Sequence, residues 1–209
     1  MSFRKLKIVH TESSCGWGGQ ELRAISDVHF ANKQGHDAVL ICDHKSQFQS
    51  RGDLCPDSLI ATSIGSKSFS CLLAMGRTLM HCKPDIVVCH SSTDSWMVAL
   101  VRLFTSLNYK ILRVRHVRTD VKPTWITRWL YRQASYIVTT SEDIREHLSD
   151  KLNLLPNRIF SIPTGIDISR DRLNPPIRPA SSSLRLGEEL TVGMVSTLRS
   201  WKGHEVALK

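Results

Sequence analysis

The sequence predicts an α/β protein organised around a Rossmann-like, doubly wound parallel sheet. Short runs of β-branched and apolar residues, typical of strands buried on both faces, alternate with segments whose apolar residues recur at helical spacing. A glycine loop, Gly16-Trp17-Gly18-Gly19, joins the first such run to the first helical segment. Parallel α/β sheets bind ligands where strands end, and glycines there permit positive φ and close backbone approach. These observations predict both the fold and the sheet edge that carries a site.

Each element follows from its local pattern. Leu6–Val9 is a β-branched run before the glycine loop, and Leu22 and Ile25 mark one face of the helix after it. Pro84 ends a later helix, because proline disfavours helical backbone in the residue before it, and Ser141 caps another. Further strands are predicted at Ala38–Cys42, Leu59–Ile64, Ile86–Cys89, Ile111–Arg115, Tyr136–Thr140 and Arg158–Ile162, and further helices around Leu72–Met80, Trp96–Leu107, Trp125–Ala134 and after Ser141.

The composition and the periodicity of the sequence change after this alternating region. We expect an amino-terminal domain at residues 1–168 and a linker at 169–189, where prolines, serines and charges follow no period. Residues 190–209 then predict the start of a second Rossmann-like domain, with a strand at Leu190–Val195 and a helix opening at Lys202-Gly203. One strand and one helical turn cannot bury a core, so we expect this second domain to be truncated.

Composition indicates a globular protein with an anionic partner. The 209 residues are 41% hydrophobic, with a formal net charge of +9 and a pI of about 9.5. Six cysteines form no CxxC pair, which favours reduced core cysteines over disulfides or a metal site. Met1–Lys5 leave no room for a signal peptide, and the longest apolar run, Trp96–Leu107, is too short to span a bilayer and is interrupted by Arg102. We expect a cytoplasmic protein.

Four motifs in order resemble the amino-terminal half of a family 4-like glycosyltransferase with two Rossmann domains, the GT-B type. They are Gly16-Trp17-Gly18-Gly19-Gln20-Glu21, Lys83-Pro84-Asp85-Ile86-Val87-Val88-Cys89-His90, Thr140-Ser141-Glu142 and Ile162-Pro163-Thr164-Gly165-Ile166-Asp167. A fifth stretch, residues 192–203, resembles the opening of the family's carboxy-terminal domain. Each motif is loose alone, whereas the ordered set is specific.

The resemblance implies a sugar transfer. In the family, the amino-terminal domain binds the acceptor and the carboxy-terminal domain binds the nucleotide-sugar. Transfer occurs between them with retention at the anomeric carbon, without an obligate metal or other cofactor. The expected acceptor is a glycan or glycolipid, such as a lipopolysaccharide core.

The resemblance also implies roles for particular residues on the acceptor side. Gly18 and Gly19 would lie beside the donor phosphates, and the loop from Ser14 to Gly16 would border the acceptor. His116, at the end of a central strand, matches a family histidine that contacts the transferred sugar. A histidine at a strand end also has a purely structural interpretation.

Two cations are expected on the donor side. By resemblance, Arg199 and Lys202 would neutralise the departing diphosphate, where charge grows as the glycosidic bond breaks. Family members often carry arginine five residues before the lysine, and here that position is Thr197. Arg199 would then substitute from two residues further on.

His10 and Glu21 flank the glycine loop and complete the candidate set. His10 ends the first strand and is either a ligand contact or a structural residue. Glu21 is either a general base or an acidic residue of the first helical turn. No tetrahedral ligand spacing accompanies the cysteines and histidines, so no metal site is expected.

A basic span with interleaved aromatic residues has two interpretations. It is a solvated face, or it docks on an anionic membrane surface, placing the protein peripherally on the inner face of the cytoplasmic membrane. No nucleic-acid module is present, so nucleic acid is not an expected partner. The span contains Arg102, Lys110, Arg113, Arg115, Arg118, Lys122, Arg128 and Arg132, with Trp96, Tyr109, Trp125, Trp129 and Tyr131.

Alternatives remain for the activity. The family's downstream glutamate pair is absent from the 209 residues, so we expect negligible turnover by this chain alone. It would then be a non-catalytic acceptor-binding half, or one subunit of a split enzyme, and its exposed cleft face would favour self-association. An NAD-dependent dehydrogenase is the weaker alternative, since only Asp43 supplies an acidic residue after the second strand.

Overall fold

The computed structural model describes residues 4–51, 53–165, 193–196 and 202–208. The chain divides into two units, Met1–Gly165 and Ile166–Lys209. In the second unit, the described elements are limited to a short helix, α8 (His204–Ala207), which follows Gly203 as predicted. The predicted linker at 169–189 lies outside the described residues. Of the predicted strand at Leu190–Val195, residues 190–192 lie outside the described residues, and Gly193–Val195 pair with no described strand.

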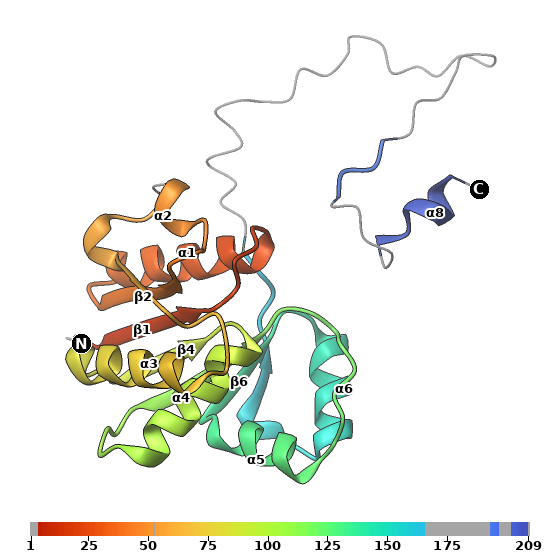
Figure 1. Ribbon diagram of the computed structural model, residues 1–209. Coiled ribbons are helices and arrows are strands. Elements are labelled where there is room, and N and C mark those ends of the chain that lie inside the picture. The colour runs from red at the N-terminus through yellow and green to blue at the C-terminus, as the bar shows by residue number, and fades with distance from the viewer. Residues whose placement is uncertain (1–3, 52, 166–192, 197–201, 209) are drawn as a thin grey trace. The chain divides into compact units, whose positions relative to one another are not determined.

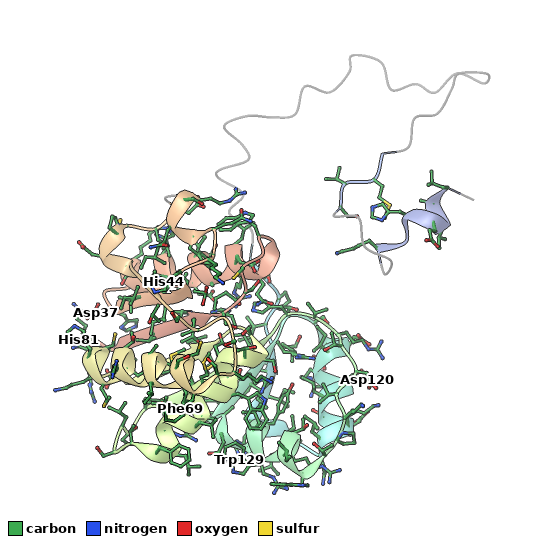
Figure 2. All side chains as sticks on the ribbon, in the orientation of Figure 1. Asp37, His44, Phe69, His81, Asp120 and Trp129 are labelled. Atoms are coloured by element: carbon green, nitrogen blue, oxygen red, sulfur yellow. The ribbon has the colours of Figure 1, made fainter. Side chains whose placement is uncertain are left out.

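The first unit is a seven-stranded, all-parallel sheet in the order β3-β2-β1-β4-β5-β6-β7 (Figure 1). The predicted doubly wound topology is confirmed. Figure 2 labels Asp37, the first residue of β2, and His44, which directly follows its last residue, so the carboxyl edge of the sheet lies on the His44 side. The strands are β1 (Lys7–Glu12), β2 (Asp37–Asp43), β3 (Leu59–Thr62), β4 (Ile86–Cys89), β5 (Lys110–Arg115), β6 (Tyr136–Thr139) and β7 (Ile159–Ser161).

Helices cover the two faces of the sheet unequally. Helix α1 packs on one face with the short α2, whereas α3, α4, α5 and α6 pack on the other (Figure 1). The helices are α1 (Gly19–Lys33), α2 (Phe48–Arg51), α3 (Phe69–Cys82), α4 (Ser92–Phe104), α5 (Trp125–Gln133) and α6 (Glu142–Leu152), and single 3-10 turns at Pro56–Ser58 and Pro156–Arg158 precede β3 and β7. On the α1 side of the last two strands, Tyr136 and Phe160 remain 51% and 44% exposed.

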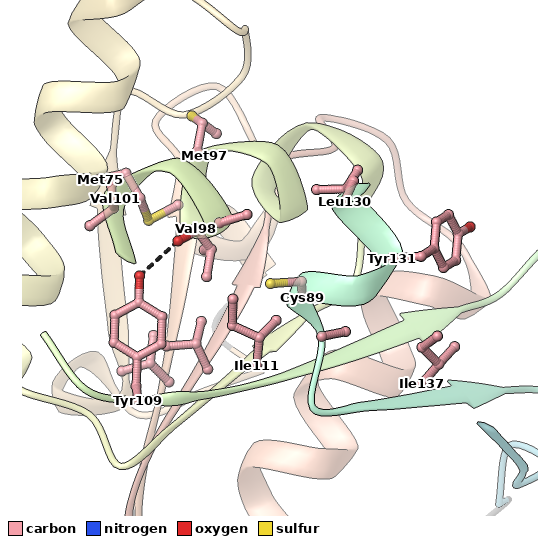
Figure 3. Close-up of a cluster of buried hydrophobic side chains, with 14 of the residues drawn as sticks. Met75, Cys89, Met97, Val98, Val101, Tyr109, Ile111, Leu130, Tyr131 and Ile137 are labelled. Carbon is pink, nitrogen blue, oxygen red and sulfur yellow. Dashed lines mark hydrogen bonds between the residues drawn. The ribbon is translucent and has the colours of Figure 1, made fainter. Parts of the chain in front are cut away.

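The larger core lies beneath α3–α6. Met75 of α3 lies there beside Val98 and Val101 of α4 (Figure 3), and Leu79 of α3 belongs to the same cluster. The buried Tyr109 hydroxyl donates a hydrogen bond of 2.7 Å to the Val98 carbonyl oxygen, which satisfies the one polar atom that this ring brings into the core. A second cluster forms where α1 packs on β2.

Three local expectations need correction. Strand β1 continues through the polar residues to Glu12, because their side chains find hydrogen-bond partners: His10 in His90, Thr11 in Asp94, and Glu12 in Ser14 and Gln20. On α1 it is Glu21 that is buried, whereas Leu22 is 50% exposed. Among the described glycines, positive φ occurs only at Gly35 and Gly203, so the glycine loop does not use the left-handed region.

Candidate functional site

Strands β1, β4 and β5 bring their carboxyl ends together at the point where the strand order reverses. The chain leaves β1 toward β2 on one side and later continues from β4 on the other side of β1. The connections that follow β1 and β4 therefore run in opposite directions, and the crevice between them is where α/β proteins bind ligands. The glycine loop after β1 lies at the same edge, so the predicted location of the site agrees with the topology.

Three histidines form a continuous row across this edge. His10 lies within β1, His90 directly follows β4, and His116 directly follows β5. Nδ1 of His10 lies 3.0 Å from Nε2 of His90, and Nδ1 of His90 lies 3.1 Å from Nε2 of His116. Both ring pairs are stacked, with centroids 5.3 Å apart. His90, the central member, was not among the predicted site residues.

Burial keeps the row uncharged. It lowers the pKa of His10 to about 3 and that of His116 to about 4, with a smaller contribution from the charge of Arg23, and it lowers the pKa of His90 well below its usual value. A neutral imidazole has one donor and one acceptor nitrogen, so all hydrogen bonds of the row run in one direction. Nδ1 of His116 is then a donor or an acceptor according to that direction.

Two buried carboxyl groups bind residues that neighbour the row in the sequence. Asp94, in the first turn of α4, accepts a hydrogen bond of 3.0 Å from the Thr11 hydroxyl and another from the Ser91 amide. Glu12 accepts from the Ser14 amide at 2.8 Å and from the Gln20 side chain. Burial raises the pKa of both carboxyl groups, and the charge of Glu12 raises that of Asp94 further. These contacts fix β1, the glycine loop and α4 to one another.

The glycine loop leaves the amino terminus of α1 open. Gly18 is the N-cap residue, and no side chain caps the helix. A Cβ at Gly18 would lie 3.7 Å from a Glu21 carboxylate oxygen, and one at Gly16 would lie 3.3 Å from the Ser14 hydroxyl, whereas one at Gly19 would meet nothing within 4 Å. The loop therefore exposes free helical amides, which attract anions, beside a buried carboxylate.

Cation binding is disfavoured at the one candidate cluster in the described part of the chain. His10, Asp27 and His90 each offer a ligand atom, and these atoms lie within 4.8 Å of one another. Both oxygens of Asp27 accept hydrogen bonds from Nε of Arg23, at 2.8 and 2.9 Å. The guanidinium group occupies the carboxylate and would repel a metal ion, so the donor set does not fit one.

Two adjoining cavities open beside the row. One, of about 210 Å³, is lined by His90, His116 and Gln20, and we call it the histidine cavity. The other, of about 300 Å³, lies against Arg113 and Tyr131, and we call it the arginine cavity. Four residues line both: Ser92, Arg113, Arg115 and Thr119.

Only some residues of the predicted basic and aromatic face are exposed at the surface. Arg113 of β5, Tyr131 of α5 and Tyr109, which directly precedes β5, are buried. Trp96 and Trp129 stack on each other with ring centroids 5.8 Å apart. Trp125, 77% exposed, remains at the surface. In the described residues, no helix combines the length and the hydropathy that a membrane span requires.

The donor-side roles of Arg199 and Lys202 stay predictions. Arg199 lies outside the described residues, and Lys202 is exposed in the second unit. Asp43, the acidic residue after the second strand, accepts backbone hydrogen bonds from Lys45, Ile64 and Gly65. Burial alone would raise the pKa of Asp43, but these amides lower it below its usual value. Its carboxylate organises the loop after β3 and is not free for a ribose.

This fold, with its crevice at the strand reversal, is that of the amino-terminal domain of GT-B glycosyltransferases. The chain aligns with a glycosyltransferase from Rickettsia africae at 19% identity and a TM-score of 0.63, covering 82% of this chain and 46% of that one. It aligns with Anabaena HepE in complex with UDP and glucose at 14% identity and a TM-score of 0.60, covering 78% and 46%. For the lipopolysaccharide outer core galactosyltransferase WaaB the values are 15%, 0.53, 73% and 43%.

The model of Glycosyltransferase Family 4 matches residues 8–170, and the chain belongs to this family. It spans about half the length of the solved structures that it matches. No curated protein matches it.

Proposed function

We propose that this chain is the acceptor-binding part of a retaining glycosyltransferase that transfers a sugar from a nucleotide-sugar to a glycan or glycolipid, such as a lipopolysaccharide core. The observation that carries the proposal is His116, which lines the histidine cavity at the end of a fixed, uncharged row of imidazoles. Family membership supports the reaction class.

The roles of the chain's own residues follow from this arrangement. His116 holds a hydroxyl of the transferred sugar through Nδ1, while His90 and His10 fix the orientation of its ring. A neutral ring suits this role, because it can hydrogen-bond a hydroxyl without placing a positive charge beside the developing oxocarbenium ion. The amides of Gly18 and Gly19 at the open end of α1 face the donor phosphates, whose charge they stabilise.

We further propose that the protein acts in the cytoplasm, at the inner face of the membrane. Helix α5 supports this location, since Trp125 and Ile126 are exposed on it beside Arg128 and Arg132. Exposed aromatic and basic residues on one helix are typical of interfacial surfaces. Unchanged sedimentation with anionic vesicles at low salt would contradict it.

The activity is tested on protein isolated from its native source, whose intact mass is measured first. Transfer of a radiolabelled sugar from nucleotide-sugars into the glycolipid fraction is then compared with that of the His116→Ala variant, with exposed His81→Ala as the control. We expect kcat to fall about 100-fold or more for His116→Ala and to be unchanged for the control. Absence of transfer from every nucleotide-sugar, or equal rates in the two variants, would reject the proposal. The 209-residue chain alone should show negligible turnover.

A further inference from the structure

Arg113 is a buried cation that forms no ion pair with any described residue. It lies in β5, is 4% exposed, and its Nη1 atom has no hydrogen-bond partner among the described residues. Its Cζ lies 4.1 Å above the ring of Tyr131, a cation–π contact that offsets only part of the loss of water. The nearby Asp94 is held toward its neutral form by burial and is occupied by Thr11 and Ser91. A buried positive charge without an ion pair is energetically costly, and binding an anion would offset that cost.

The arginine cavity offers the space and the charge for that anion. Besides Arg113, it is lined by Arg115 and Lys122, and by Tyr131, whose buried hydroxyl also lacks a partner among the described residues. In Figure 3 this hydroxyl points away from the apolar cluster. The single acidic group of the lining, Asp120, is 74% exposed and accepts a hydrogen bond from Lys151 at 2.9 Å, so its charge is already compensated.

A helix terminus reinforces this preference. Ser92, the first residue of the 13-residue helix α4, lines the same cavity. The Ser91 hydroxyl accepts from the Asp94 amide, which leaves the amides of Ser92 and Thr93 without an intrahelical acceptor. The positive end of the helix dipole and a bidentate guanidinium group are both suited to phosphate.

We propose that the arginine cavity binds a phosphate ester carried by the acceptor, so that the acceptor of the reaction is a phosphorylated sugar or a phosphate-linked glycolipid. This inference rests on the proposed function. The two cavities share Ser92, Arg113, Arg115 and Thr119, so an acceptor whose phosphate lies in the arginine cavity extends toward the histidine cavity, where His116 holds the transferred sugar. Arg113 then sets the distance between the phosphate and the hydroxyl that receives the sugar.

Binding is tested on the 209-residue chain with inorganic phosphate, glucose 1-phosphate and glucose as probes. The side-chain Nε–H resonance of Arg113 is followed by NMR during each titration. We expect both phosphates, but not glucose, to shift this resonance. Arg113→Met should weaken phosphate binding about tenfold or more, whereas Arg128→Met, which removes an exposed arginine of the same span outside the cavity, should leave it within about twofold. Equal phosphate binding by the Arg113 and Arg128 variants would overturn the site.

Stability separates a ligand-binding role from a structural one. Because Arg113→Met removes an unpaired buried charge, it should preserve or raise the unfolding midpoint, and a lower midpoint would indicate a structural arginine. Should this variant fail to fold, Lys122→Met at the exposed rim provides the same comparison, with weaker phosphate binding expected and unchanged binding counting against the site. Vesicles of phosphatidylglycerol and of phosphatidylcholine distinguish a lipid-borne phosphate from a soluble one, since only the lipid source gives Arg113-dependent binding to the anionic vesicles.

The inference and the proposed function fail differently. Transfer by the native protein to phosphorylated and phosphate-free acceptors at equal kcat/KM would overturn the phosphate subsite while the transferase stands. Arg113-dependent phosphate binding without sugar transfer to any acceptor would support the site and reject the transferase.

Discussion

The row of imidazoles should make the stability of the fold depend on pH, and His116 provides the measurable handle. Its pKa is about 4 in the folded protein against 6.5 for an unperturbed histidine. Because the fold holds this ring neutral, its contribution is complete above about pH 6.5 and is lost as the pH falls through that value toward 4. At pH 5 the loss corresponds to about 1.5 pKa units, or roughly 2 kcal/mol of unfolding free energy.

Neighbouring acids act in the opposite direction. Burial raises the pKa of Glu12 and Asp94, so the folded protein takes up these protons before the unfolded chain does, and stability rises as the pH falls. His10 and His90 add to the loss from His116. The absolute slope of stability against pH therefore mixes these five groups with other shifted carboxyl groups such as Asp27, whereas the difference in slope between wild type and His116→Gln reports mainly on the proton of His116.

The assay is urea unfolding followed by circular dichroism between pH 7.5 and 5. Wild type should lose about 2 kcal/mol more over this range than His116→Gln does. His81→Gln is the control, since His81 is exposed in the last turn of α3, at the opposite edge of the sheet (Figure 2). Parallel stability curves for wild type and His116→Gln would refute the assignment of this histidine as a neutral member of the row.

Other predictions concern single contacts. Tyr109→Phe leaves the Val98 carbonyl without the hydroxyl of Tyr109, and we expect a loss of about 1 kcal/mol in urea unfolding; an unchanged midpoint would contradict it. Ser91→Ala removes the hydroxyl that accepts from the Asp94 amide but keeps the Ser91 N–H that donates to the Asp94 carboxylate, and should cost about 1 kcal/mol in the same assay; an unchanged midpoint would contradict the cap. Zinc ions should leave the melting temperature unchanged, because Arg23 occupies Asp27; a rise with zinc would show that the cluster binds metal after all.

Periodicity was sufficient for most of the fold. The predicted strand at Ile86–Cys89 has the observed limits, and the predicted helix at Trp125–Ala134 ends one residue late. Strands that are buried on both faces are apolar throughout, and proline and serine mark helix ends chemically. The continuation of β1 could not be predicted this way, since the buried Thr11 hydroxyl is satisfied by residues far along the chain: Asp94, 83 residues later, and the Val88 carbonyl oxygen.

The candidate site was predicted in location but not in composition. His10 and His116 are brought together as the strand-end positions suggested, but only through His90. His90 follows the predicted strand Ile86–Cys89 as His116 follows its own strand, so the same strand-end signal could have identified it. Arg113 looked like one more surface cation in a basic span. It shares the buried face of β5 with Ile111, two residues earlier, and the two-residue period of the strand was the signal that could have placed it.

The unequal covering of the sheet has a consequence for local opening. Strand β7 is three residues long, has β6 as its one neighbour, and carries Phe160 on the side that no described helix covers. Strand β1, by contrast, pairs with β2 and β4 and lies under α1. Amide hydrogens of the β6–β7 pair should therefore exchange with deuterium before those of the central strands. The amide hydrogens of β1 and β4 should exchange only when the whole domain unfolds. The strands that hold the histidine row are thus the last part of the sheet to lose its order.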